Sequence, residues 1–497
     1  MTDVRCKIMG VLLLLLVTLT AAAGDFVTRG CRRGVMKAPT ALRRGEGPVR
    51  QPGGDFYVGD RRQLVVLVSF PDLTFTDDDP SATLGKFDKI FNAVGYTEEP
   101  YRGSVHDYFY DQSNGKFRLS FDLEYVALTT DRTKYRSTSA DDENSQYLVQ
   151  DVTEVLRTRD IDWSQYDWNG DGYVNQIIII YPGKGMNDGG DNRSIWPHQW
   201  WLSQHLKDRQ EDVFCDPVTV SYNGVDYKVD CYCALQELGG VCNPFGTICH
   251  EYTHCFGFPD FYYGSTAFAG YWELMDRGNI SGSGFCPPNY SAHERWLMGW
   301  LTPRELTEAT TVTNMLPLGS ADVLVDEPQA YLVRNDGWTD EYYIIENRQQ
   351  QGWDSALPGS GIAIFHIDFD SDIWCGASME YANTSSYQRY TIFRANNSSI
   401  ASGWAYPCTT SGKENNCLTD DSLPAATLNH ANSAGTMKMG KSITNMSLTG
   451  TLASFDFLGG TTVVYQPRSH SASQLLYQFG PINIIRNAQG EVKKVIK

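Results

Sequence analysis

The stretch NPFGTICHEYTHCFGFPD, residues 243–260, carries the most specific pattern in the chain. Asn243 is a typical helix N-cap, and Pro244 is favoured at the first helical position. Gly257 is typical of the left-handed end of a helix. The sequence therefore predicts one short helix and then a sharp turn that brings the chain back beside it.

Two histidines of this helix are four residues apart, so the imidazoles of His250 and His254 project from one face and can bind one cation. The turn at Gly257 brings Asp260 toward the same ion. Three N/O ligands with an open fourth position are typical of catalytic zinc, whereas structural sites are closed by four protein ligands. Glu251 lies beside the ligands and is the expected general base. The alternative, a histidine pair buried in a helical core, leaves the added glycine and aspartate unexplained.

A second segment, YWELMD at residues 271–276, resembles the turn that metzincin peptidases form beneath their metal. Met275 would present its thioether under the ligands, and ordinary core packing of this residue is compatible with that position. Glu273 is the alternative third ligand. Asp260 is preferred as the third ligand because the turn at Gly257 would bring it toward the two histidines, and without that role the glycine turn has no explanation.

The chain has 497 residues, which is more than one hydrophobic core normally holds, so we expect two or three domains. A hydrophobic fraction of 41% is enough for packed cores and excludes a disordered chain. The formal net charge is −18 at pH 7. A charge of that sign repels phosphate groups, so nucleic acids and anionic membrane surfaces are not expected partners.

The N-terminus has the pattern of a secretory signal. Arg5 and Lys7 precede the apolar run Val11–Thr20, and three alanines follow at 21–23. A membrane anchor is the alternative, but the run is shorter than the roughly 20 apolar residues that a transmembrane helix needs. No later run approaches that length. We therefore expect residues 1–23 to be a signal peptide and the protein to be secreted.

Twelve cysteines fit an oxidising compartment. Cys6 would leave with the signal, and ten of the others follow residue 210, which predicts up to five disulfide bonds. A local bond between Cys408 and Cys417 is the single pairing that the sequence suggests.

Residues 24–56 form a basic extension rich in glycine and proline, typical of a linker or of a pro-segment. This extension contains Cys31, the odd thiol of the exported chain. One hypothesis is that Cys31 binds at the open zinc position and keeps the protein latent.

Strands and helices alternate over residues 57–300. The runs 64–70 and 176–181 are rich in β-branched residues and are typical of strands buried on both faces. Helical periodicity is present at 84–94 and at 145–157. The alternation predicts an α+β (mixed α/β) domain that carries the site at one edge of its sheet.

The pattern changes beyond residue 300. Short strands separated by Gly, Asn, Ser and Pro clusters predict an all-β, sandwich-like domain over 301–460. The tail, 461–497, contains apolar runs at 482–485 and 492–496, which predict either a hairpin or a sorting signal.

A loop of oxygen-bearing residues precedes the second buried strand. Asp167, Asn169 and Asp171 alternate before a tight glycine turn, and the Tyr173 carbonyl and Asn175 follow. This order is typical of the opening of a Ca²⁺-binding loop, but it is no EF-hand, because an isoleucine stands where the bidentate Glu would be. The alternative is a polar turn without a metal.

Ten stretches lie in a characteristic order between residues 61 and 460: LVVLVSFPD (64–72), GSVHDYFYDQSNGKF (103–117), DWNGDGYVNQIIII (167–180), IWPH (195–198), HEYTHCFGFPDFY (250–262), YWELM (271–275), RWLMGWLTP (295–303), EYYIIENRQ (341–349), LPGSGIAIFHID (357–368) and ITNMSLTGTLASFDF (443–457). In these stretches the chain resembles the immune-inhibitor-A-like secreted zinc metallopeptidases. The resemblance implies a metzincin-like zinc peptidase domain, a following β domain and a calcium ion in the aspartate-rich loop. The cysteines and the short N-terminal extension depart from the family pattern and leave the mode of activation open.

We therefore expect a secreted, monomeric endopeptidase that acts on proteins or peptides, with catalytic Zn²⁺ and structural Ca²⁺. Tyr262 and His198 are the candidates for a second hydrogen-bond donor to the substrate. One alternative is an extracellular binding or adhesion protein that uses the zinc fold as a scaffold, although such a scaffold has no use for Glu251. Another alternative is a hydrolase of non-peptide amides or glycans.

Overall fold

The computed structural model describes residues 57–137, 144–205, 207, 214–320, 328–374 and 381–460, and the backbone of three strands in the tail. The predicted signal peptide (1–23) and the basic extension (24–56) with Cys31 lie outside these residues. None of the helices in the described ranges has the length and apolar character that a membrane span requires.

The central sheet has five strands: β1 (Gly59–Ser69), β2 (Phe117–Ala127), β4 (Ile177–Lys184), β5 (His198–Trp201) and β8 (Cys231–Leu238). Their order across the sheet is β2-β1-β4-β8-β5. The first four strands in this order are parallel, and β5 pairs antiparallel with β8 at the edge. The strands predicted at 64–70 and 176–181 are confirmed as β1 and β4.

Four helices of eight residues or more accompany this sheet in the described ranges: α2 (Pro80–Asn92), α3 (Val105–Gln112), α4 (Ser145–Leu156) and α5 (Phe245–Cys255). Alternate residues of β1 enter different cores, as a strand with both faces covered requires. Val65 and Leu67 share a core with α2, α3 and α5. Leu64 and Val66 share the opposite core with α4 and with the small sheet of β3 (Tyr173–Val174), β7 (Val225–Val229) and β6 (Val218–Tyr222).

The helix expected at 84–94 is confirmed as α2, but it begins earlier. Asp79 caps it by accepting a hydrogen bond from the Ser81 amide at 3.1 Å, and Pro80 takes the first position. An aspartate at the N-cap and a proline at the first helical position both favour the start of a helix. These two residues therefore predict the earlier start, although the apolar periodicity begins only later. The helix expected at 145–157 is confirmed as α4.

Most of the chain beyond residue 300 forms β-strands. One sheet contains β9 (Arg304–Glu305), β11 (Ala330–Arg334), β12 (Glu341–Arg348), β13 (Gly361–Asp368) and β14 (Tyr390–Ile392), and a second contains β10 (Thr310–Met315), β17 (Ile443–Thr449) and β18 (Leu452–Phe457). The two sheets share a core, in which Tyr343 and Ile364 of the first pack with Val312 and Phe455 of the second. Other elements in the described ranges are α6 (Ala292–Leu297), α7 (Ser371–Trp374) and the hairpin of β15 (Cys408–Thr410) and β16 (Lys413–Asn415).

The tail contains β19 (Gln474–Phe479), β20 (Ile482–Arg486) and β21 (Val492–Ile496). The strands β20 and β21 pair antiparallel, as the hairpin interpretation of the two apolar runs predicts, and β19 adds a third strand.

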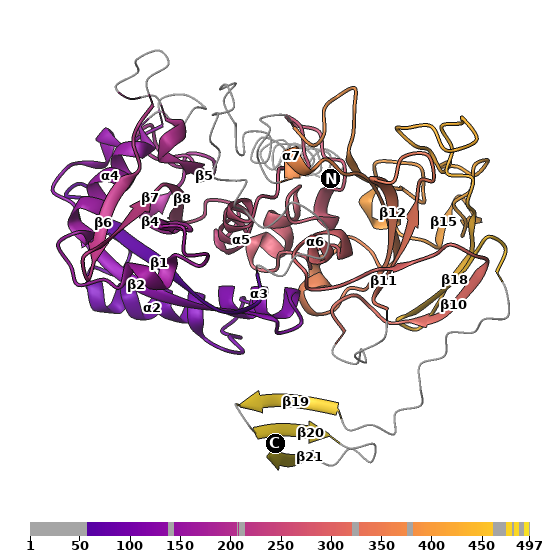
Figure 1. Ribbon diagram of the computed structural model, residues 1–497, viewed down its shortest axis with the longest axis horizontal. Helices are drawn as coiled ribbons and strands as arrows, with labels where there is room; N and C mark the ends of the chain where they lie inside the picture. The colour runs from indigo at the N-terminus through magenta and orange to yellow at the C-terminus, as the bar shows by residue number, and fades with distance from the viewer. Residues whose placement is uncertain are drawn as a thin grey trace, which may run out of the picture.

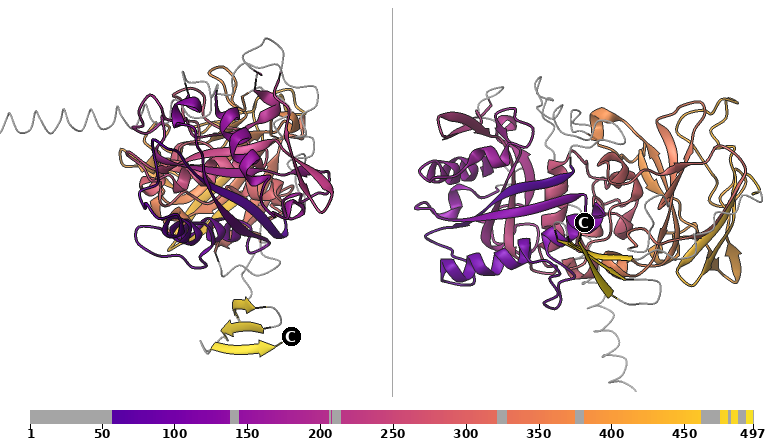
Figure 2. Two further views of the ribbon diagram at one scale, coloured as in Figure 1. Left: turned by 90° about the vertical axis from the view of Figure 1, so that its left-hand side faces the viewer. Right: turned by 60° about the horizontal axis from the view of Figure 1, so that its bottom comes forward.

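The other face of the C-terminal five-stranded sheet packs against the first half of the chain. Ile344 and Phe365 of this sheet belong to the same buried core as Met275 and Trp300. Figure 1 shows the result: α5 and α6 lie between the central sheet and the C-terminal sheets, and the right-hand view of Figure 2 shows the two groups of sheets on opposite sides of the molecule. One core therefore continues across residue 300.

None of the nine cysteines within the described ranges forms a disulfide bond: Cys215, Cys231, Cys233, Cys242, Cys249, Cys255, Cys286, Cys408 and Cys417. The disulfide prediction is therefore not confirmed. For the suggested local pair, the Sγ of Cys408 lies 3.8 Å from the Thr410 hydroxyl, and that of Cys417 lies 3.9 Å from the Asn415 side-chain oxygen.

A buried arginine joins the two halves of the molecule. Arg348 on β12 is fully buried, and its guanidinium donates to Asp354 at 2.6 and 2.7 Å and to Glu346 at 2.9 Å. It also donates to the backbone carbonyls of Trp272 at 3.3 Å and Asn289 at 3.1 Å. The guanidinium of Arg348 thus donates hydrogen bonds to two buried carboxylates and to two backbone carbonyls from the first half of the chain.

Replacing this arginine should destabilise the whole protein. Arg348→Met leaves Asp354 and Glu346 buried without their cation, which costs about 3–5 kcal/mol of unfolding free energy. The matched control is Arg157→Met, because Arg157 is exposed and pairs with Glu154 at 3.0 Å on the surface of α4. We expect the control to change the unfolding free energy by less than about 1 kcal/mol. Urea unfolding of both variants measures this, and equal losses would contradict the assigned role.

Candidate metal centre

Helix α5 lies where its sequence predicts a helix, but its first residue comes one position later. The N-cap is Pro244 and the first helical residue is Phe245, so the expected cap at Asn243 and first helical position at Pro244 are each wrong by one residue. The side-chain oxygen of Asn243 accepts a hydrogen bond from the Phe245 amide at 2.9 Å. Gly257 has a φ of +96°, a left-handed conformation that residues with a side chain rarely adopt. The chain reverses at this point, and Asp260 lies back beside the helix.

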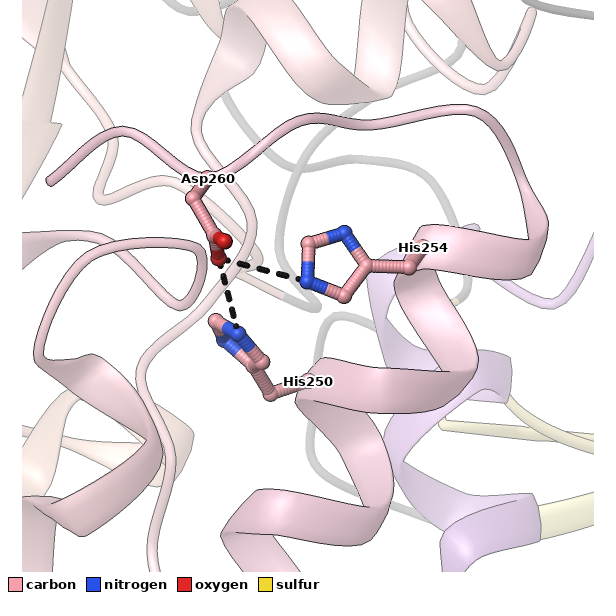
Figure 3. Close-up of side chains that lie close together, drawn as sticks. All are labelled: His250, His254 and Asp260. Atoms are coloured by element: carbon pink, nitrogen blue, oxygen red, sulfur yellow. Dashed lines mark ion pairs between the residues drawn. The ribbon is translucent and has the colours of Figure 1, made fainter. Parts of the chain in front are cut away.

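The reversal brings three side chains together. The Nε2 atoms of His250 and His254 each lie 3.2 Å from Oδ1 of Asp260 (Figure 3). All three residues are buried, and their ligand atoms lie within 4.8 Å of one another. The structure therefore assembles the group that the spacing predicts.

Backbone carbonyls orient both rings. Nδ1 of His250 lies 2.8 Å from the Leu274 carbonyl, and Nδ1 of His254 lies 2.7 Å from the Phe258 carbonyl. A carbonyl can only accept, so each Nδ1 carries the hydrogen. In a neutral ring the lone pair is then on Nε2, directed toward Asp260, which is the arrangement that metal-binding histidines adopt.

The electrostatics of the group fit a cation. Burial lowers the pKa of His250, but the contact with the Asp260 carboxylate and the charge of Glu251 outweigh it and raise this pKa to about 9. Burial raises the pKa of Asp260, yet His254 and His250 bring it below its usual value. Nε2 of His254 and Oδ1 of Asp260 are buried and make no hydrogen bond within the described part of the chain. A divalent cation would satisfy both atoms, and three N/O donors match catalytic zinc.

Glu273, the alternative third ligand, has other partners. Its carboxylate accepts from the Met275 amide at 3.2 Å and from the Tyr390 hydroxyl at 2.8 Å. Burial raises its pKa to about 7. Among the described residues, the group that could hold a metal ion contains Asp260 and not Glu273. The preference for Asp260 as the third residue of the group is thus supported.

Comparison with known families agrees with this geometry. Residues 57–299 match the model of the immune inhibitor A peptidase M6 catalytic domain. This segment is an M6 peptidase domain. The M6 family is a family of metalloendopeptidases, and zinc is the metal that the family implies for His250, His254 and Asp260. Among curated proteins, no match to the chain was found.

Met275 of the M6 domain is fully buried in the core that also contains α5. Its backbone carbonyl accepts a hydrogen bond at 2.8 Å from the amide of Phe261, the residue that follows Asp260. The 271–276 segment therefore pairs with the chain next to Asp260, and its Leu274 carbonyl orients the ring of His250.

Glu251 lies on α5 between the two ligand histidines and is 4% exposed. It directly follows His250 in the chain, and its charge is among the causes that raise the pKa of that histidine. The position is suitable for a group that exchanges protons with a water molecule at the metal.

His198 is not a suitable donor to a substrate. Its Nδ1 lies 2.6 Å from the Trp196 carbonyl and its Nε2 lies 2.9 Å from the Tyr232 hydroxyl, so both ring nitrogens are engaged. Burial lowers its pKa to about 4, which keeps the ring neutral. Tyr262, the other candidate, directly follows Phe261 in the sequence and is also buried. Its role as a donor stays a prediction.

The predicted calcium loop is closed by its own backbone. The carboxylate of Asp167 accepts from the amides of Gly170, Asp171 and Gly172 at 2.9 to 3.1 Å. Asp171 accepts from the Tyr173 amide at 2.8 Å, and its other oxygen accepts from the Asn169 side chain at 3.2 Å. The Asn175 side chain accepts from the Trp168 amide at 2.6 Å. These bonds form a polar turn, and calcium binding there stays a prediction.

Sequence reasoning missed the two carbonyls that orient the histidines, at Leu274 and Phe258. A carbonyl is present at every residue, so no residue type signals this role. The spacing between the helix and the 271–276 segment is the only hint in the sequence.

The ligand assignment predicts different zinc contents for two variants. Asp260→Ala should lower zinc affinity by at least about 100-fold, because even the loss of a residue that only supports a ligand costs 10- to 100-fold. Glu273→Gln keeps the size of the side chain and one of its two acceptor oxygens. Because Glu273 is not part of the group that could hold the ion, this variant should retain zinc. Metal analysis after dialysis against a competing chelator measures both. The reverse pattern would make Glu273 the ligand.

Proposed function

We propose that this protein is an exported zinc-dependent endopeptidase in which Glu251 is the general base. The observation that carries the proposal is the convergence of two Nε2 atoms and one carboxylate oxygen within 4.8 Å, on a helix that also bears Glu251. The proposed substrates are proteins and peptides, in keeping with the M6 family.

The mechanism follows from the positions of these groups. Zinc, when bound, supplies a Lewis acid that makes a water molecule acidic and polarises the peptide carbonyl. The carboxylate of Glu251 accepts a proton from the attacking water and later returns it to the nitrogen of the leaving amine. The bonds from Nδ1 of His250 and of His254 to backbone carbonyls direct both Nε2 atoms toward Asp260, the orientation in which a neutral imidazole can bind a metal.

The proposal also covers the architecture in finer detail. A helix with two histidines, a glycine turn, a third ligand and a buried methionine turn follow one another as in metzincins, so we assign the domain to that arrangement. The two C-terminal sheets share one core, which supports a sandwich-like organisation. Export rests on the leader sequence in residues 1–23 and stays a prediction.

A structural calcium ion at the 167–175 loop is part of the same proposal. Its support is the alternation of Asp167, Asn169 and Asp171 before the turn at Gly172. Millimolar Ca²⁺ should raise the Tm of the wild type by a few degrees and leave the Tm of Asp171→Asn unchanged, because a ligand that binds only the folded state stabilises it. Equal responses of the two proteins in a thermal scan would remove calcium from the proposal.

The central experiment is hydrolysis of a quenched-fluorescent casein by the purified protein. Glu251→Gln should lower kcat/KM by about 10²- to 10⁴-fold, the range expected for loss of a general base, while zinc content stays at the wild-type level. Wild type treated with 1,10-phenanthroline should be inactive and should recover when zinc is added. The control variant is Glu154→Gln, since Glu154 is an exposed carboxylate on α4, remote from the metal group in sequence.

The outcomes separate the proposal from its alternatives. Full activity of Glu251→Gln with zinc bound would remove Glu251 from the mechanism. Bound zinc without hydrolysis of casein by any sample would favour the binding or adhesion protein, and hydrolysis of a glycan panel instead would favour a non-peptide hydrolase.

A further inference from the structure

Three thiols meet where α5 packs against the central sheet. Cys231 and Cys233 are two residues apart on β8, so both side chains point to the same face of the strand. Cys255 is the last residue of α5 and directly follows His254. The Sγ of Cys255 lies 3.4 Å from the Sγ of Cys233 and 3.8 Å from that of Cys231.

The cluster is buried, with one thiol partly open to solvent. Cys233 is fully buried and Cys231 is 7% exposed, whereas Cys255 is half-buried. The Glu251 carbonyl accepts from the Cys233 thiol at 3.5 Å and from the Cys255 thiol at 4.0 Å. The sulfur atoms therefore lie against the helical turn that bears the general base and one ligand histidine.

We propose that Cys233 and Cys255 form a disulfide bond that ties the C-terminal turn of α5 to β8. The 3.4 Å separation leaves the sulfurs about 1.4 Å from bonding distance, an approach that rotation of two side chains supplies. Cys231 is the more distant partner of Cys255 and remains a thiol. This inference holds whether or not the protein is a peptidase, because it depends only on the contact between β8 and α5.

The oxidant is a small-molecule disulfide, such as glutathione disulfide. The partly exposed Cys255 thiolate attacks one sulfur of glutathione disulfide, which forms a mixed disulfide and releases one glutathione thiolate. The Cys233 thiolate then attacks the Cys255 sulfur, which forms the protein disulfide and releases the second glutathione. Two thiol protons go to the two glutathione molecules, so two cysteines are oxidised as one disulfide is reduced.

The bond would act on the metal centre through the backbone. It closes the chain segment between residues 233 and 255, which contains the loop before α5 and almost the whole helix. A cross-link of this kind restricts the unfolded chain and thereby stabilises the folded one. It also limits the fraying of the last turn of α5, where His254 lies.

The test uses the full-length protein loaded with zinc and equilibrated with glutathione disulfide. Free thiols are alkylated with iodoacetamide under denaturing conditions, and the digest is examined by mass spectrometry. We expect a peptide pair that joins Cys233 to Cys255, is absent after reduction, and leaves Cys231 alkylated. Full alkylation of Cys233 and Cys255, or a bond between Cys255 and Cys231, would overturn the proposal. This readout needs no variant.

Thermal stability gives the second readout. Oxidised protein should melt about 5–10 °C above reduced protein, as expected for a loop of this length in a domain of this size. Cys233→Ser and Cys255→Ser should each lose that difference. Cys249→Ser is the matched control and should keep it, because Cys249 is buried on the same helix and no hydrogen bond to another cysteine is found for it among the described residues. Loss of the difference in the control alone would contradict the assignment.

Discussion

Two hydrogen bonds to backbone carbonyls determine what the histidines of α5 can do. Because Nδ1 of His250 and of His254 donates to Leu274 and Phe258, both Nε2 atoms are directed at Asp260. The carbonyls are fixed in turn by the chain around them. Phe258 lies in the reversal that begins at Gly257, and Leu274 lies in the segment that pairs with the residue after Asp260. The ligand geometry is thus a property of two loops as much as of one helix.

The second of these loops depends on the C-terminal sheets. Tyr390 of β14 donates to Glu273, and Arg348 of β12 donates to the Trp272 carbonyl, so the 271–276 segment is held by two side chains from beyond residue 300. Each of these groups is buried, and burial of a charge is tolerated only when partners surround it. The β-rich part of the chain therefore supports the candidate metal centre, even though none of its described residues belongs to the group that could hold the ion.

The sequence specified the parts of this arrangement that depend on local chemistry. The spacing of His250 and His254 on a helix, the left-handed turn at Gly257 and the buried strands β1 and β4 all follow from residue type and period. It could not show that one core continues past residue 300, because an apolar strand reveals that it is buried and not what covers it. The sequence also could not decide whether Asp260 or Glu273 is the third residue of the metal group, because this depends on which of the two the folded chain brings beside the histidines. Cysteine number predicted disulfides, but only the packing of α5 on β8 brings particular thiols together.

The support from beyond residue 300 has a consequence for the order of events during synthesis. A nascent chain emerges from its N-terminus, and early segments begin to fold while later ones are still being added. All three ligands leave the ribosome well before Arg348 and Tyr390 do. The carbonyl that orients His250 therefore gains its full support only when most of the polypeptide has been made.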